Sequence, residues 1–270
     1  MLEKIIDITV CAGKIVMKMR EDGLQTETKS DSFDFVTSAD IESEKYIMKR
    51  LSEEFPKDSI LSEEKGMIKK GLSRVWMVDP LDGTKDFKNG RDGFSIMIGL
   101  CENGKPILGV VYAPAKNLLY FSQKGQGSYV RIDGKDHKLK VSKTKYLKDA
   151  AMVTRIPHGE KREEDKIEEI FIVKKKIPES SVGIKLGLIA SHEADFHINT
   201  NFRANKWDTC APQIILEEAG GKVTDLYGNS LSYTQSDNKW LKSFVASNKV
   251  LHEDIIKKIK ESYLKKLNFS

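Results

Sequence analysis

Two aspartates stand three residues apart in the segment WMVDPLDGTKDF, residues 76–87, just after an apolar run. We predict that a strand delivers Asp79 and that Pro80 then bends the chain. The carboxylates of Asp79 and Asp82 would converge there, with the Leu81 carbonyl between them. Two carboxylates and a carbonyl are hard oxygen ligands of the kind that Mg²⁺ prefers, and a site with this much negative charge has reason to hold more than one ion.

The next two residues, Gly83 and Thr84, favour a helical turn whose free backbone amides would cradle a phosphate oxygen. A simpler interpretation is a surface turn, because Asp-Gly is among the commonest turn dipeptides and aspartates at a strand end are more often solvated than bound to metal. The segment alone leaves both interpretations open, and other acidic segments bear on the choice.

Three further segments carry acidic side chains at the edges of predicted elements. Glu63 and Glu64 end a short strand, where two glutamates before a glycine are typical of a surface turn. Asp208 stands where it would cap the N-terminus of a helix, with Pro212 in the first turn. In the segment VTSAD, Thr37 or Asp40 precedes another helix and has the same simple explanation as its N-cap. Each of these carboxylates therefore has an ordinary structural role available to it.

The first half of the chain is predicted to pack helices on a meander of strands. Apolar residues at helical spacing predict an N-terminal amphipathic helix packed on the core, within residues 1–20, and a second helix at 41–55. The polar, aperiodic stretch 20–35 is predicted to be a loop that covers a site. Short runs of β-type residues between turn signals predict a mostly antiparallel meander. These strands are expected at 59–61, 75–78, 94–101, 106–113 and 118–122.

The second half alternates strand and helix patterns after a lysine-rich hinge at residues 138–149. Strands are expected at 150–155, 177–181 and 223–228, and helices at 160–173, 183–191, 209–219 and 249–267. The helix at 209–219 ends at a Gly-Gly pair, as a glycine C-cap would dictate. The last helix has an apolar stripe between lysines, which suits membrane or partner binding but more often docks on its own domain.

Helix and strand patterns are mixed throughout, which predicts an α+β or α/β fold. We expect two lobes. The first, residues 1–145, is an α+β lobe with most of the candidate ligands, and the second, residues 146–270, is an α/β lobe with Asp208.

Composition excludes several classes of function. Lys and Arg total 45 against 40 for Asp and Glu in 270 residues, with the signs interspersed, which suits anionic substrates but not a nucleic-acid surface. No run approaches the ~20 apolar residues of a membrane span. Asp7 and Lys14 interrupt the N-terminal apolar stretch, so it is not expected to be a signal peptide. Three cysteines without a CxxC pair favour free thiols in a reducing compartment, and hence a cytoplasmic protein.

In order along the chain, VTSAD, LSEE, DPLDGTKDF and WDTCAPQIILEEAGG closely resemble the signature segments of the inositol monophosphatase superfamily, over about residues 35–227. The resemblance implies a layered αβαβα sandwich with the site between the two lobes. It also implies a lithium-sensitive, magnesium-dependent phosphomonoesterase with two or three Mg²⁺ ions. Its partner would be a small anionic phosphate ester rather than nucleic acid or a membrane, and metal-activated water would attack without a covalent intermediate.

The same resemblance implies a role for each motif residue. The metal ligands would be Glu63, Asp79, the Leu81 carbonyl, Asp82 and Asp208, with Asp79 bridging two ions and Glu64 behind the ligands. Thr84, with Asp40 behind it and Glu63 beside it, would orient and deprotonate the attacking water. The substrate phosphate would lie against Leu81, Asp82, Gly83, Thr84 and Asp208.

The segments KWDTCAP and GGKVTDLYGNSLSY resemble the 3'(2'),5'-bisphosphate nucleotidase branch, which hydrolyses adenosine 3',5'-bisphosphate to AMP and serves sulfur metabolism. In that branch a serine-then-lysine segment contacts the nucleotide phosphate and ribose, and ESSVGIKLG supplies Ser181 and Lys185. VTRIPHG loosely resembles a histidine segment of the branch, which implies that His158 binds the other phosphate; otherwise a lone loop histidine is simply exposed.

Other substrates remain open. The GTAA-like segment of inositol monophosphatases is replaced here by VGIK, which counts against inositol phosphate without excluding it. Inositol 1-phosphate and fructose 1,6-bisphosphate are therefore the alternative substrates. A second alternative is a regulator that binds metal and phosphate without turnover. The sequence does not distinguish a monomer from a homodimer.

Overall fold

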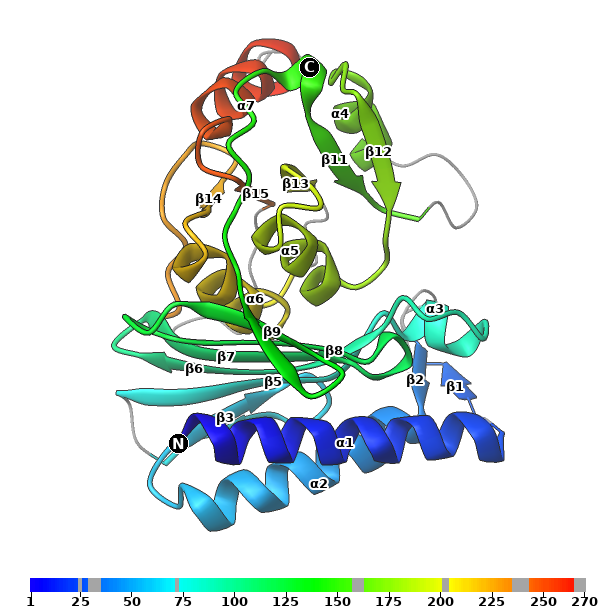
Figure 1. Cartoon of the computed structure of the whole chain (residues 1–270). Helices are drawn as coiled ribbons and strands as arrows, with labels where there is room; N and C mark the ends of the chain where they lie inside the picture. The colour runs from blue at the N-terminus through cyan, green and yellow to red at the C-terminus, as the bar shows by residue number, and fades with distance from the viewer. Residues whose placement is uncertain are drawn as a thin grey trace.

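The computed structural model describes residues 1–23, 26–28, 35–70, 73–156, 163–200, 204–234 and 243–264 of the chain. Helices and sheets alternate in five layers (Figure 1). The helices are α1 (Leu2–Asp22), α2 (Ser38–Glu54), α3 (Thr84–Lys88), α4 (Glu163–Glu169), α5 (Val182–Ala190), α6 (Lys206–Glu218) and α7 (His252–Ile259). Helices α1 and α2 form one outer layer, α5 and α6 the central layer, and α4 and α7 the other outer layer. The predicted αβαβα sandwich is confirmed.

An eight-stranded sheet lies between the α1/α2 layer and the central helices, in the order β10-β9-β8-β7-β6-β5-β3-β4. Its strands are β3 (Ser59–Ser62), β4 (Gly66–Ile68), β5 (Arg74–Asp82), β6 (Ser95–Glu102), β7 (Lys105–Ala113), β8 (Leu118–Gln123), β9 (Ser128–Ile132) and β10 (Lys135–Lys138). From β5 to β10 the strands form the predicted antiparallel meander, whereas β3 pairs parallel with β5. The short strands β4, β9 and β10 were not predicted, and every residue of β10 is exposed, so no apolar alternation marks it.

A five-stranded sheet lies on the other side of the central helices, in the order β12-β11-β13-β15-β14. Its strands are β11 (Ala151–Thr154), β12 (Lys175–Pro178), β13 (Phe196–Asn199), β14 (Lys222–Asp225) and β15 (Phe244–Ser247). Strands β12, β11 and β13 are parallel, and β13, β15 and β14 are antiparallel. The sequence did not predict β13 or β15, which are four residues each.

Part of the stretch predicted to be a loop is regular structure. Helix α1 continues to Asp22, and a small hairpin of β1 (Thr26–Thr28) and β2 (Phe35–Thr37) follows it. The expectation of an irregular loop over all of residues 20–35 was therefore wrong. Polar composition hid the hairpin, because strands this short carry no measurable alternation.

Apolar cores fill the spaces between the layers. Ile5 of α1 and Trp76 of β5 belong to the core between α1/α2 and the eight-stranded sheet. Met97 and Leu186 belong to the central core, which both sheets share. Ile255 belongs to the core between the five-stranded sheet and α4 and α7. Successive layers thus bury their apolar faces against each other, which is what holds the sandwich together.

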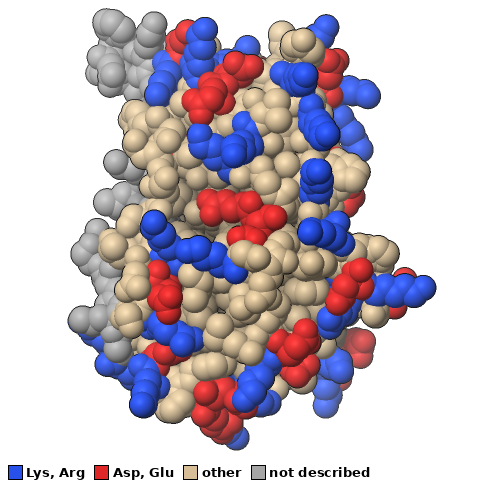
Figure 2. Space-filling view, turned by 60° about the vertical axis from the view of Figure 1, so that its left-hand side comes forward, with Lys and Arg blue, Asp and Glu red and all other residues tan. Residues whose placement is uncertain are grey.

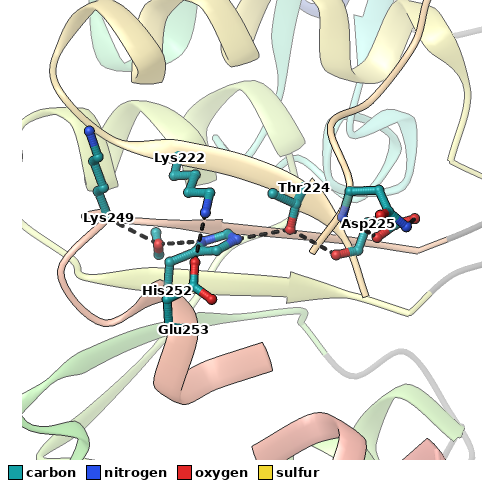
Figure 3. Close-up of polar contacts among 8 residues, drawn as sticks. Lys222, Thr224, Asp225, Lys249, His252 and Glu253 are labelled. Atoms are coloured by element: carbon teal, nitrogen blue, oxygen red, sulfur yellow. Dashed lines mark hydrogen bonds and ion pairs between the residues drawn. The ribbon is translucent and has the colours of Figure 1, made fainter. Parts of the chain in front are cut away.

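Helix α7 docks on the five-stranded sheet, as predicted, with Ile255, Ile256 and Ile259 buried. It begins at His252 rather than at residue 249, and residues 260–264 continue as a π-helical turn. His252 anchors its start: the imidazole Nε2 lies 2.8 Å from Thr224 Oγ1 and Nδ1 lies 2.8 Å from Ser247 Oγ (Figure 3).

The surface shown in Figure 2 carries basic and acidic side chains interspersed over its upper and lower halves, as the sequence predicted. None of the helices in the described ranges has the length and apolar character needed to cross a membrane.

Two glycines let α6 approach the eight-stranded sheet closely. Gly99 of β6 and Gly109 of β7 are register partners. A Cβ on Gly109 would lie 2.3 Å from the Ala211 carbonyl oxygen, and one on Gly99 would lie 2.8 Å from the Ala211 amide nitrogen. Only the absence of side chains at both positions permits this contact. It brings the first turns of α6 down onto the sheet beside β5.

Candidate active site

Glu63 and Asp79 lie side by side because parallel neighbouring strands carry them. In the register of β3 and β5, Ser62 stands opposite Val78, so a carboxylate follows next on each strand. The Glu63 amide donates a hydrogen bond to the Val78 carbonyl (3.2 Å). Asp79 is buried and Glu63 is half-buried. The parallel pairing therefore gathers these carboxylates at one edge of the sheet.

The predicted bend after Asp79 is present and is held by side-chain contacts. Pairing with β6 shifts register between Asp79 and Asp82, although β5 runs on to Asp82 and not only to residue 78 as predicted. The Leu81 amide donates to Asp79 Oδ1 (3.1 Å) and the Thr84 hydroxyl donates to the Leu81 carbonyl (3.0 Å). The bend thus places both aspartates and the Leu81 carbonyl in one short segment, as the sequence indicated.

Gly83 makes the sharp entry into α3. Its φ of 90° is left-handed, and a Cβ there would lie 2.4 Å from the Gly93 carbonyl oxygen. Any other residue would be strained and would clash with the backbone. Thr84 is the first residue of α3, so the predicted helical turn after the aspartates is confirmed.

Helix α5 holds Asp82 from the opposite side of the site. Ser181 caps this helix, accepting from the Ile184 amide (3.2 Å), and its hydroxyl donates to Asp82 Oδ2 (2.6 Å). The Gly183 amide donates to the same oxygen (3.1 Å). Because the Ser181 proton goes to Asp82, the neighbouring Ser95 hydroxyl donates to Ser181 Oγ (2.8 Å). The start of α5 is therefore fastened to a candidate metal ligand.

Lys185 lies one turn further along α5 and is only 5% exposed. Burial raises the pKa of Asp82, while the Ser181 hydroxyl, the Gly183 amide and the Lys185 ammonium oppose that rise. The two residues of the predicted serine-then-lysine segment thus come together with Asp82. Their predicted contact with a nucleotide stays a prediction.

Asp208 is the third residue of α6 rather than its cap. The helix begins at Lys206, three residues earlier than predicted, with Asn205 at the N-cap. The Asn205 amide donates to Asp208 Oδ2 (2.7 Å), so the aspartate reaches back to the residue before the helix. This contact extends the helix N-terminally. Pro212 accordingly lies in the helix interior and not in the first turn, which corrects the prediction.

Asp40 makes the same kind of contact at the start of α2. The helix begins at Ser38 with Thr37 as its cap, so Asp40 is its third residue and does not precede it as predicted. Asp40 Oδ2 accepts from the Thr37 amide (2.8 Å) and hydroxyl (2.6 Å), and the Asp40 amide donates back to Thr37 Oγ1 (3.2 Å). This reciprocal pair is a capping box. Of the two residues that the sequence offered as the cap, Thr37 is therefore the cap, and Asp40 supports it from the third position of the helix.

The acidic side chains form one cluster, in which Asp40 and Asp79 are buried and Glu63, Asp82 and Asp208 are half-buried. Burial raises the pKa of Asp79 well above its ordinary value, and the negative charges of Glu63, Asp82, Asp208 and Asp40 raise it further. Burial raises the pKa of Asp208 to about 8, and the Asp82 charge adds to the effect. Side chains from α2, the end of β3, β5 and α6 thus lie close enough to act on one another, and part of their surface is open to solvent. We call these five residues the acidic cluster.

The acidic cluster suits a divalent cation by its chemistry. Within the described ranges, no three His, Cys, Asp or Glu side chains already stand at the spacing of ligands around one ion. The donors are nevertheless hard oxygens, and a positive ion would favour the charged carboxylates. Burial raises the pKa values of Asp79, Asp82 and Asp208, and neighbouring negative charges add to the rise for Asp79 and Asp208. Protein donors hold each of these three through one oxygen, as the outer-shell partners of metal ligands do.

Two predicted residues remain to be placed. His158 lies outside the described residues, so its predicted role is not addressed by the structure. Glu64 donates its amide to Glu44 Oε1 (3.1 Å). Glu44 and Ser43 were not predicted, yet both contact segments that carry the acidic cluster. The available signal was spacing, since Glu44 follows Asp40 by four residues on one helix face.

Comparisons with known proteins give matches along nearly the whole chain. The model of the inositol monophosphatase family matches residues 2–264. A fructose-1,6-bisphosphatase/inositol-1-monophosphatase of Thermotoga maritima is 31% identical over 240 residues, which cover 87% of this chain and 86% of that protein. A 3'(2'),5'-bisphosphate nucleotidase CysQ of Aggregatibacter actinomycetemcomitans is 30% identical over 260 residues, covering 93% of this chain and 92% of that protein. The solved structure of a T. maritima IMPase matches with a TM-score of 0.83 at 29% identity and covers 96% of each chain.

Proposed function

The chain belongs to the inositol monophosphatase family of phosphatases, and from this premise we propose that it is a magnesium-dependent 3'(2'),5'-bisphosphate nucleotidase. Its reaction would convert adenosine 3',5'-bisphosphate to AMP and phosphate. The observation that carries this choice is the buried Lys185 beside Asp82, at the start of α5. A bisphosphate substrate brings a second anionic group besides the one that is hydrolysed, and a buried ammonium at the border of an acidic cluster suits that group.

The residues that would hold the metal are the carboxylates of Glu63, Asp79, Asp82 and Asp208 together with the Leu81 carbonyl. Bound divalent ions supply an activated water and neutralise charge on the transferred phosphoryl group. The family is generally metal-dependent, and we propose Mg²⁺ because these ligands are all hard oxygens.

Protein groups would then orient the water and the substrate. The Thr84 hydroxyl directs its proton to the Leu81 carbonyl, so its oxygen is available to accept a hydrogen bond from water. Glu63 of the acidic cluster would take the proton from that water. The Gly83 and Thr84 amides at the start of α3 would hold the phosphate, with Ser181, Lys185 and His158 as the proposed contacts of the remainder of the nucleotide.

A comparison of substrates tests the proposal. We expect magnesium-dependent phosphate release with a kcat/KM at least ~100-fold higher for adenosine 3',5'-bisphosphate than for inositol 1-phosphate or fructose 1,6-bisphosphate, which is ~2.7 kcal/mol of transition-state binding. Lys185→Met should reduce kcat/KM for adenosine 3',5'-bisphosphate more than it reduces kcat/KM for inositol 1-phosphate. A preference for inositol or sugar ester would overturn the nucleotidase assignment.

The relative from T. maritima, named for both fructose-bisphosphatase and inositol-monophosphatase activity, favours this broader specificity as a second candidate. Equal kcat/KM values for the sugar and inositol esters, with slower nucleotide hydrolysis, would support it.

Catalysis itself is tested by ligand substitution. Asp82→Asn and Asp208→Asn should each abolish turnover and leave the circular dichroism spectrum unchanged, because each removes charge from the acidic cluster but keeps the side-chain shape. Wild-type activity in either variant would contradict the site assignment. Inhibition by millimolar lithium is also expected, and a regulator without turnover could not show it.

A further inference from the structure

Glu44 is a buried carboxylate that the proposed mechanism does not use. It lies on α2, is 2% exposed, and points into the turn between β3 and β4. Its Oε1 accepts hydrogen bonds from the Ser62 hydroxyl, from the Glu64 amide (3.1 Å) and from the Lys65 amide (3.0 Å). One oxygen atom therefore collects three donors from four consecutive residues.

This arrangement resembles an anion nest whose anion is supplied by the protein. Successive backbone amides in a tight turn form a concavity that binds an anion, and here the Glu44 carboxylate fills it. Burying a carboxylate is costly unless donors compensate it, and the three donors do so. The turn that links β3 to β4 is consequently built around a side chain from another element.

Glu63 is the residue between the donors. Ser62 before it and Glu64 after it are both bonded to Glu44 Oε1, so the backbone at Glu63 is held on both sides. The Glu63 amide is in turn bonded to the Val78 carbonyl of β5. The position of Glu63 relative to Asp79 therefore depends on Glu44 as well as on strand pairing.

The neighbouring residue of α2 acts on the other ligand segment. The Ser43 hydroxyl donates to the Pro80 carbonyl (2.9 Å), in the bend between Asp79 and Asp82. Two consecutive residues of α2 thus contact the segments on which Glu63 and Asp79 lie. Helix α2 is anchored at its start by the capping box of Asp40, one turn earlier.

We propose that Glu44 is a positioning residue that sets the affinity of the acidic cluster for divalent cations by fixing the backbone of Glu63. The inference rests on the proposed function, because it requires Glu63 to be a metal ligand. Glu44 is not a ligand in this proposal, since its Oε1 is engaged by the turn.

The test measures binding of Mg²⁺ alone, by calorimetry, without substrate. Loss of an outer-shell partner costs about 10–100-fold in metal affinity, so Glu44→Ala should raise the Mg²⁺ Kd by that factor. Glu44→Gln keeps an oxygen for the same three donors and should stay within about fivefold of the wild type. Ser59→Ala is the matched control: Ser59 Oγ accepts from the Lys70 amide (3.0 Å) at the far end of the same hairpin. Its Kd should stay unchanged.

The outcomes distinguish failure of the proposed function from failure of the positioning role of Glu44. A wild-type protein that binds no Mg²⁺ and releases no phosphate would overturn the proposed function and this inference with it. Mg²⁺ binding by the wild type with an unchanged Kd in Glu44→Ala would overturn the inference alone. If Glu44→Ala does not fold, Ser62→Ala removes one of the three donors and keeps the carboxylate. That variant should raise the Kd by about threefold to tenfold, and an unchanged Kd there would equally refute the positioning role.

Discussion

Replacing Gly109 by alanine tests whether the close packing of α6 sets the position of Asp208. The new Cβ would lie 2.3 Å from the Ala211 carbonyl oxygen and 2.7 Å from Ile214 Cγ2. Since non-bonded atoms rest at about 3.5 Å, α6 must move away from the sheet by roughly 1 Å. Asp208 lies three residues before Ala211 on the same helix and should move with it.

The displacement has an expected cost in stability and a separate cost in catalysis. Overpacking of this kind costs about 1–3 kcal/mol of unfolding free energy. A misplacement of about 1 Å in a catalytic group costs on the order of 10²-fold in rate. Urea unfolding would measure the first effect, and kcat/KM for phosphate release from adenosine 3',5'-bisphosphate would measure the second.

Gly13→Ala provides the control for overpacking without displacement of α6. Its Cβ would lie 2.5 Å from the Tyr112 ring, where α1 packs on the opposite face of the same strand, β7. We expect a loss of stability of about 1–3 kcal/mol but a kcat/KM close to that of the wild type. If Gly109→Ala lost only stability, as the control should, the argument that glycine packing positions Asp208 would be refuted.

Three further predictions follow from particular contacts. Ser181→Ala removes the 2.6 Å bond to Asp82, and because hydrogen bonds to charged groups contribute about 1.5–3 kcal/mol, kcat/KM should fall about tenfold or more; an unchanged value would contradict the role of α5. Burial lowers the pKa of His252 to about 4 from 6.5, so its contribution to stability is complete above pH 6.5 and is lost as pH falls through 4. In urea titrations from pH 7 to 4, the unfolding free energy of the wild type should decline by about 3 kcal/mol more than that of His252→Gln. Equal declines would show that His252 does not cause the pH dependence. Lys116 Nζ lies 2.5 Å from the buried carboxylate of Glu179, and Lys116→Met would leave that carboxylate without its cation. Because Lys116 is partly exposed, we expect a loss of about 1–2 kcal/mol of unfolding free energy in urea. A change near zero would show that this ion pair contributes negligibly to stability.

Sequence motifs predicted the candidate site better than they predicted its supports. Asp79, Asp82 and the bend between them follow from an apolar run, a proline and a DG turn, all of which are local signals. The approach of Glu63 to Asp79 depends instead on the parallel register of β3 and β5. Register is a long-range property that no local pattern encodes, so only the family resemblance brought these two residues together in advance.

The starts of α2 and α6 were predicted too late for a specific reason. Asp208, and either Thr37 or Asp40, were taken as the residue at the edge of a helix, because these residue types are strong N-caps. Asp40 and Asp208 are each in fact the third helical residue and bond back to the cap, Thr37 or Asn205. A Thr or Asn three residues before an acidic residue carries this signal, and an aspartate considered alone does not.

Strands β13 and β15 escaped prediction because they are buried on both faces. Strand β15 is buried at all four positions and β13 at three of four, so neither shows the alternation that marks a strand with one solvated face. Glu44 was missed for a related reason. A buried glutamate within a charged helix looks like a solvated one until its partners are known.

The proposed substrate contacts and a candidate metal ligand are mechanically linked through the start of α5. Ser181 and the Gly183 amide both hold Asp82, so the start of α5 cannot change without affecting a candidate metal ligand. Gly183 is constrained further, because a Cβ there would lie 2.7 Å from Val111 Cγ1 and 2.8 Å from Met97 Sδ. Lys185, one turn later, adds its positive charge to the groups that favour the charged form of Asp82. Positions 181 and 183 are therefore tied to the candidate ligand that every substrate of the proposed reaction would need.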